Sequence, residues 1–114
     1  MELPNCVRAV VPQEKITGYL LSFAHRDGRA KAAFFTRFGF SADAWRELAA
    51  ARRHHAASYE VARVESSPFG TRYVIEGAIA TPDGRNPEIR SVWFIETGED
   101  VPRFVTAYPL ERNV

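Results

Sequence analysis

The apolar residues of this chain change their spacing once, near Ser58, and that change sets the order of its secondary structure. Before Ser58 they recur every three or four residues, which is typical of helices that bury one face. After Ser58 they alternate with polar residues, which is typical of strands that bury one face. The sequence therefore predicts an α+β domain, with N-terminal helices packed on a β-sheet.

Two helices are predicted in the first half of the chain. The first spans residues 28–38, with Asp27 as its N-cap and Gly39 as the residue that ends it. The second spans residues 42–57, with Ser41 as its N-cap. The inner stripe of the second helix is expected to consist of Trp45, Leu48, Ala49, Arg52 and Ala56, with His55 beside it.

Four strands with short connections are predicted in the second half, over residues 59–66, 71–80, 88–96 and 103–108. Such sequential strands favour an antiparallel meander, so the expected order is ααββββ. The helices should cover one face of the sheet, because neither layer can bury its apolar side alone. Simple alternation places Phe104, Thr106 and Tyr108 on one face of the last strand.

The 114 residues, of which 46% are hydrophobic and 25% charged, fit a single globular domain. Residues 1–14 are predicted to form an irregular arm, 15–57 the helical half and 58–109 the antiparallel sheet. The single cysteine, Cys6, excludes an internal disulfide and fits a reducing compartment, so a cytoplasmic location is expected. No signal peptide and no membrane partner are expected, because no apolar run approaches the roughly 20 residues that a membrane helix needs.

The net charge of +1 is unevenly distributed along the chain. Residues 1–57 hold nine Lys and Arg against five acidic residues, whereas residues 58–114 hold six Arg against nine acidic residues. A basic half can attract an anion such as RNA. The alternative is an ordinary solvated helix surface, since dedicated nucleic-acid binders are usually more basic overall.

Several common catalytic signatures are absent from the sequence. It contains no glycine-rich phosphate loop, no His-Glu-x-x-His and no Cys-x-x-Cys. The neighbouring His54 and His55 do not suit a shared helical metal site, because adjacent helical side chains point about 100° apart. No metal and no cofactor are therefore expected.

Polar residues within the predicted strands are the first candidates for a site. If helices cover one sheet face, the other face can display Arg90, Thr106 and Tyr108 to a phosphate. Arginine binds phosphate through its planar fork of donors, and hydroxyl groups can donate to it. The alternative is structural: Arg90 pairs across strands with Glu76 or Glu65, and threonine and tyrosine serve as good strand formers.

His25 is the second kind of candidate. It precedes the first predicted helix, and Arg26, Arg29 and Lys31 follow it closely. A histidine in basic surroundings can act as a general acid or base beside a bound phosphate, because its pKa lies near neutrality. The alternative is an ordinary loop histidine with a hydrogen bond or an exposed ring.

A resemblance adds to these observations. It rests on Gly18 to His25, Gly28, Lys31, Phe35, Gly39-Phe40, Phe69 to Tyr73, Pro82 to Arg85, Arg90 to Trp93 and Pro102 to Pro109. Over about residues 15–109, the chain resembles a small bacterial family of unknown function, the domain of unknown function 6883 type. It is also similar to C-terminal toxin domains of bacterial contact-dependent and polymorphic toxins, which are placed in the barnase/EndoU/colicin/RelE ribonuclease superfamily.

The resemblance implies a fold, a reaction and a site. Members of that superfamily pack N-terminal helices on a four-stranded antiparallel sheet and cleave RNA on its open face. The implied activity is a metal-independent endoribonuclease of toxin type that leaves a 2′,3′-cyclic phosphate. The residues that match such a site are His25, Lys31, Arg90, Thr106 and Tyr108.

Two partner types follow from this resemblance, RNA as substrate and a cognate antitoxin or neighbouring-gene protein. A non-catalytic interaction domain, acting as a toxin partner or inhibitor, stays open as the alternative. A homo-oligomer stays open as well.

Overall fold

The computed structural model describes residues 1–17 and 29–110. Its elements are η1 (Cys6–Arg8), α1 (Gln13–Lys15), α2 (Arg29–Arg37), α3 (Trp45–Ser58), β1 (Val61–Ser67), β2 (Gly70–Ala78), β3 (Glu88–Glu96) and β4 (Arg103–Pro109). This is the predicted α+β fold, with the helices before the strands. Within the described ranges, no helix combines the length and the apolar character that crossing a membrane requires.

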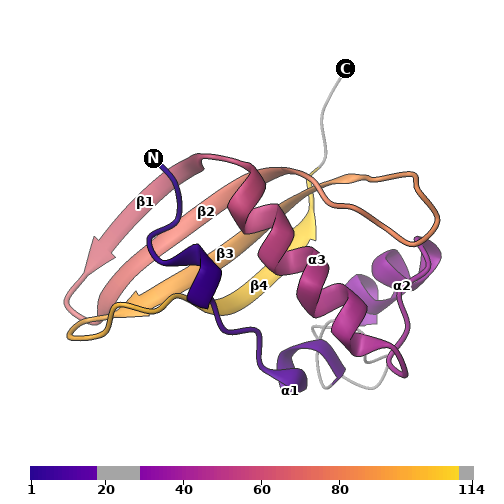
Figure 1. The fold of residues 1–114 in the computed structure, drawn as a ribbon, viewed down its shortest axis with the longest axis horizontal. Helices are drawn as coiled ribbons and strands as arrows, with labels where there is room; N and C mark the ends of the chain where they lie inside the picture. The colour runs from indigo at the N-terminus through magenta and orange to yellow at the C-terminus, as the bar shows by residue number, and fades with distance from the viewer. Residues whose placement is uncertain (18–28, 111–114) are drawn as a thin grey trace.

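The four strands form one antiparallel sheet in the order β1-β2-β3-β4, so the predicted meander is confirmed. Helix α3 crosses one face of the sheet, and α2 lies beyond it on the side of β4 (Figure 1). Side chains such as Leu48 from α3 and Ile75, Ile89 and Trp93 from the sheet are fully buried in the core. Burial of each large apolar side chain contributes about 1.5–3 kcal/mol, which is why the amphipathic α3 stays on this face.

The N-terminal arm, predicted to be irregular, is part of the packed core. Leu3 and Val11 are buried, and η1 lies in front of the sheet together with α3 (Figure 1). Val10 forms a parallel bridge with Arg103, the first residue of β4. The first residues of the chain therefore protect one end of the β4 edge.

The end of α2 was predicted correctly. Gly39 has a φ of +104°, the Phe40 N–H donates to the Phe35 carbonyl at 3.2 Å, and the Gly39 N–H donates to the Thr36 carbonyl at 3.1 Å. These two bonds and the positive φ form a Schellman motif, which satisfies carbonyl groups left free at the helix end. The proposed N-cap Asp27 lies outside the described residues.

The start of α3 differs from the prediction. The helix begins at Trp45 rather than at residue 42, and Ala44 occupies the N-cap position. Ser41 is therefore not the N-cap of α3, and its hydroxyl instead accepts the Ala44 N–H at 3.3 Å within the preceding turn. A serine turn of this kind uses the same local hydrogen-bonding capacity that makes serine a good cap, so the two are hard to separate by sequence.

The β3–β4 pairing contains a bulge that corrects a second prediction. Val92 pairs with Thr106 whereas Trp93 pairs with Phe104, so β4 contains one extra residue, Val105, at this point. The extra residue reverses the alternation. Phe104 therefore faces the core, where its ring centroid lies 5.4 Å from that of Trp93, and does not share a face with Thr106.

A chain of buried polar groups connects α3 to the sheet. His55 Nε2 lies 3.1 Å from the Gly77 carbonyl oxygen, and His55 Nδ1 lies 3.1 Å from Ser91 Oγ. Trp93 Nε1 donates to the same Ser91 oxygen at 3.0 Å. These contacts satisfy every member when Nε2 carries the imidazole proton, Nδ1 accepts from the serine hydroxyl, and that hydroxyl accepts from Trp93. His55 is thus an interior residue rather than one beside the buried stripe.

Candidate functional site

Three side chains form a row across the face of the sheet opposite α3. Glu76 on β2 is directly across from Arg90 on β3, and Arg90 is directly across from Tyr108 on β4. Arg90 Nε donates to Glu76 Oε2 at 2.7 Å, and its NH2 group forms an ion pair with the same oxygen. Its NH1 group donates to the Tyr108 hydroxyl at 3.4 Å. The guanidinium group is therefore held between a carboxylate and a phenol.

Helix α2 contributes a second cation to this row. Lys31 Nζ donates to Thr106 Oγ1 at 2.7 Å and lies 5.7 Å from the centroid of the Tyr108 ring. The Arg90 guanidinium carbon lies 5.6 Å from the same centroid. Lys31 and Arg90 therefore both approach the Tyr108 ring. Lys31, Glu76, Arg90, Thr106 and Tyr108 are called the cationic cluster below.

The cationic cluster is positively charged and partly accessible to solvent. It contains two cations and one carboxylate, and the side chains of Arg90 and Glu76 are each 30% exposed. Hydrogen bonds to Tyr108 and then to Glu76 raise the pKa of Arg90, so its charge is fixed. A half-buried pair of cations with hydroxyl groups beside them has the composition of a phosphate-binding site.

A groove of about 320 Å³ lies next to the cationic cluster. It is lined by Ala62, Arg63, Val74, Glu76 and Arg90. Arg90 and Glu76 belong to both the groove and the cluster, so the two features are continuous on the β1 side of Arg90. This face of the sheet thus offers a charged centre with a shallow extension.

The structure brings four of the five sequence-predicted site residues together: Lys31, Arg90, Thr106 and Tyr108. The fifth, His25, lies outside the described residues. The structural alternative for Arg90 also holds, since it pairs with Glu76 and not with Glu65. Glu76 is predicted only as a possible pairing partner of Arg90, and the β2–β3 register, which sets it directly opposite Arg90, adds it to the site.

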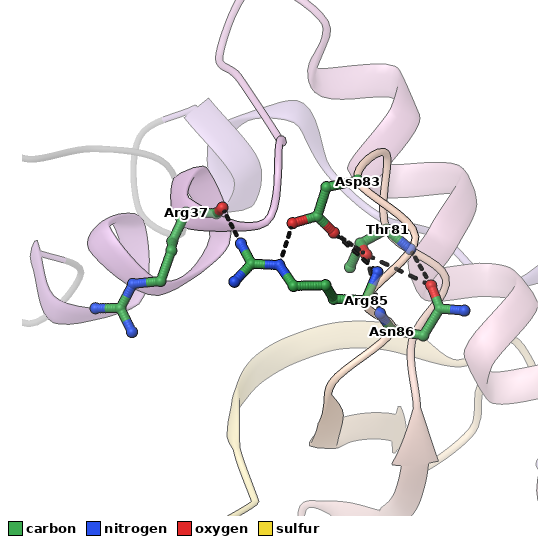
Figure 2. Close-up of polar contacts among 5 residues, drawn as sticks. All are labelled: Arg37, Thr81, Asp83, Arg85 and Asn86. Carbon is green, nitrogen blue, oxygen red and sulfur yellow. Dashed lines mark hydrogen bonds and ion pairs between the residues drawn. The ribbon is translucent and has the colours of Figure 1, made fainter.

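A second polar cluster holds the C-terminal end of α2, the end away from Lys31. In the turn between β2 and β3, the Asp83 carboxylate accepts from the Thr81 hydroxyl at 2.8 Å and from the Arg85 backbone N–H at 3.0 Å. The Arg85 side chain pairs with Asp83 and donates to the Arg37 carbonyl at 2.7 Å (Figure 2). The guanidinium group therefore lies at the C-terminal end of α2, where a cation is favoured by the helix dipole.

Two further contacts strengthen this junction. The guanidinium carbon of Arg85 lies 4.4 Å from the centroid of the Phe38 ring, and the Asp83 N–H donates to the Phe38 carbonyl at 3.3 Å. The backbone N–H of Arg85, followed by hydrogen bonds from the side chains of Arg85 and Thr81, lowers the pKa of Asp83. Because α2 also carries Lys31, this turn helps to set where the lysine meets β4.

Comparisons with known proteins agree with this fold. A family model described as a domain of unknown function, DUF6883, matches residues 2–111. Among solved structures, a chain of the contact-dependent growth inhibition toxin–immunity protein complex from Klebsiella pneumoniae 342 is similar, with a TM-score of 0.72 and 16% identity. That match covers 94% of this chain and 97% of the other, and at this identity it shows the fold alone. No curated protein matches the chain.

Proposed function

Since the chain belongs to the DUF6883 family, a domain of unknown function, we propose an activity from its side chains: metal-independent endoribonucleolytic cleavage of RNA. The observation that carries this proposal is the convergence of Lys31, Arg90, Thr106 and Tyr108 on one face of the sheet. The likeness to a chain of a toxin–immunity protein complex supports a toxin-related role.

The reaction is a transesterification at one phosphate. The ribose 2′-oxygen loses its proton to a base and forms a bond to the adjacent phosphorus. The bond from phosphorus to the 5′-oxygen breaks, and that oxygen takes a proton from an acid. The products are a 2′,3′-cyclic phosphate and a free 5′-hydroxyl, and no oxidant or reductant is required.

The cluster residues suit the charge changes of this reaction. Negative charge builds on the non-bridging phosphate oxygens, and Lys31 and Arg90 are placed to stabilise it. Thr106 and Tyr108 position the phosphate and the two cations. His25 is the proposed acid or base, because imidazole exchanges protons near neutral pH.

The test is cleavage of total bacterial RNA by the purified protein in the presence of EDTA. We expect discrete fragments with cyclic phosphate ends, and we expect His25→Ala, Lys31→Ala and Arg90→Ala to slow their formation by at least about 100-fold. Arg46→Ala, which removes an exposed cation of α3, is the matched control and should cleave like the wild type. Intact RNA, or cleavage that survives all three substitutions, would contradict the proposal.

A second candidate is a non-catalytic domain that binds a toxin or another partner protein. The observation in its favour is the outer edge of β1: among the described residues, β2 is the only strand that pairs with it, and residues 62–67 are exposed. Such an edge can accept a strand from a partner. A stable complex with a neighbouring-gene protein, formed by a chain that leaves RNA intact, would favour this function.

A further inference from the structure

The groove beside Arg90 is bordered by a bulge in β1. Val61 pairs with Ile75 and Arg63 pairs with Val74, so Ala62 is an extra residue between them. Bulges bend a strand and redirect a side chain, and they are common next to active sites. Here Ala62 and Arg63, from the bulge, line the groove on β1, and Arg90 lines it on β3.

The groove combines an apolar floor with charged walls. The exposed Ala62 supplies the apolar surface, the buried Val74 lies beside it, and Arg63, Glu76 and Arg90 supply the charges. Glu76 is neutralised by Arg90, whose Nε and NH2 groups both contact its Oε2. The remaining positive charge of the groove is therefore on Arg63.

Arg63 retains donors for an incoming anion. Its Nε donates to Glu65 Oε1 at 3.0 Å, and its side chain is 62% exposed. Its two terminal NH2 groups have no partner within residues 1–17 and 29–110. An exposed pair of this kind contributes little stability, so a phosphate can compete with Glu65 for Arg63.

We propose that the groove binds the RNA strand next to the scissile phosphate, and that Arg63 contacts a neighbouring phosphate. This inference rests on the proposed function. The ribose or base between the two phosphates would lie on Ala62, whose side chain is exposed. A single strand fits the groove because the groove is shallow and open, and Arg63, held only by an exposed ion pair, suits one backbone contact.

The experiment compares Arg63→Ala with Arg72→Ala. Arg72 is the matched control, because it also lies near Glu65, at 3.8 Å, but does not line the groove. Binding of a fluorescein-labelled single-stranded RNA is followed by anisotropy in the Lys31→Ala background, which suppresses cleavage. Cleavage of the same RNA is measured in the wild-type background.

We expect Arg63→Ala to weaken RNA binding by about 5- to 20-fold and to lower the slope of log Kd against log salt by about 0.7, as for one lost single-strand phosphate contact. KM should rise with little change in kcat, and Arg72→Ala should remain within about twofold of its parent. A third variant, Glu65→Gln in the Arg72→Ala background, should tighten binding because it releases Arg63. A folding defect is expected to weaken binding, so tighter binding separates the contact from such a defect.

Equal binding and KM for Arg63→Ala and Arg72→Ala, in a chain that cleaves RNA, would overturn the groove assignment and leave the proposed function intact. RNA binding that depends on Arg63 in a chain that never cleaves would support the groove and overturn the catalytic proposal. A chain that neither binds nor cleaves single-stranded RNA would overturn both.

Discussion

Lys31 Nζ on α2 donates a hydrogen bond to Thr106 Oγ1 on β4, across 75 residues of sequence. The bond joins a helix to the open face of the sheet, and it fixes the ammonium group beside the Tyr108 ring. A lysine side chain has four rotatable carbon bonds, so without such an acceptor the ammonium group would sample many positions.

Thr106→Val tests the importance of this contact, because valine preserves the shape of the side chain and removes the acceptor. We expect RNA cleavage to fall by about tenfold, while the free energy of unfolding changes by no more than about 1 kcal/mol. Single-turnover cleavage and urea unfolding measure the two quantities. Thr106→Ser, which keeps the hydroxyl, is the control, and equal loss of activity in both variants would assign the effect to packing.

Arg90→Lys tests whether the guanidinium fork is needed or only its charge. Lysine cannot contact Glu76 and Tyr108 through separate planar donors, so we expect cleavage to fall by at least about tenfold although the charge is kept. Arg103→Lys makes the same change at an exposed position of β4 and should retain activity. Wild-type activity in Arg90→Lys would mean that charge alone suffices.

His55 makes the fold sensitive to acid. Burial lowers its pKa from 6.5 to about 4, because the imidazole lies in the core, with a smaller contribution from the nearby Arg52 charge. Between these two values the unfolded chain binds a proton that the folded chain does not. The free energy of unfolding should therefore be constant above about pH 6.5 and fall as the pH drops towards 4, by about 3 kcal/mol in total from this residue.

Urea unfolding between pH 7.5 and 4.5 measures this dependence. In His55→Gln the titrating ring is absent, so the curve should be flatter from pH 6.5 to 5, where few carboxylates titrate. His54→Ala, which removes the neighbouring exposed ring, is the control for the loss of one histidine. An equal pH dependence in His55→Gln and the wild type would contradict the assignment.

Arg52 is a buried cation that has no counter-charge among residues 1–17 and 29–110. It is fully buried, burial lowers its pKa to about 9, and none of its three nitrogens hydrogen-bonds a residue in the described part of the chain. Its guanidinium carbon lies 4.4 Å from the Phe35 ring centroid and 5.5 Å from that of Phe104, so two aromatic rings offset part of the cost of burial.

Arg52→Met should therefore stabilise the protein, since methionine fills a similar volume without a buried charge. We expect the free energy of unfolding to rise by about 1 kcal/mol or more, measured by urea unfolding at pH 7. Arg52→Ala should instead be destabilising, because it leaves a cavity. A destabilised Arg52→Met would indicate that a bound anion or water satisfies the guanidinium group.

Arg85→Ala removes the cation at the C-terminal end of α2. We expect a loss of stability on the order of 0.5–1 kcal/mol. The loss of the contact with the Arg37 carbonyl should loosen this helix end, so we expect faster amide hydrogen exchange in 33–38. Because α2 carries Lys31, we also expect weaker RNA cleavage. Arg85→Lys keeps the charge at the helix end, so its stability, its hydrogen exchange and its RNA cleavage should lie between those of the wild type and of Arg85→Ala. Unchanged exchange in α2 would show that the Schellman motif holds this helix end without Arg85.

The sequence predicted most of this architecture because the pattern of apolar residues is regular. The four strands, the stripe of α3 and the glycine that ends α2 all follow from local periodicity and local backbone preference. The site was harder to predict than the fold, because Lys31 and Thr106 are brought together only by the docking of α2 on β4. The resemblance, rather than the periodicity, placed these two residues in one site before the fold was known.

The errors have local causes. The predicted face of Phe104 was wrong because a β-bulge depends on how two strands pair, and the sequence of one strand alone does not indicate it. The burial of His55 was underestimated because its polar partners, Gly77 and Ser91, belong to strands about 20 and 35 residues away. A buried histidine is tolerated only when both ring nitrogens are satisfied, and that depends on tertiary contacts.

Val105 also affects how relatives of this chain should be aligned. Removing this one residue would join Phe104 to Thr106 in ordinary alternation, with the phenylalanine still in the core and the threonine still on the open face. A homologue one residue shorter here would therefore preserve both surfaces and lose only the local bend. An ungapped alignment of such a homologue would shift one half of the strand by one position and would assign core residues to the site. Residues on the two sides of the bulge should therefore be aligned separately.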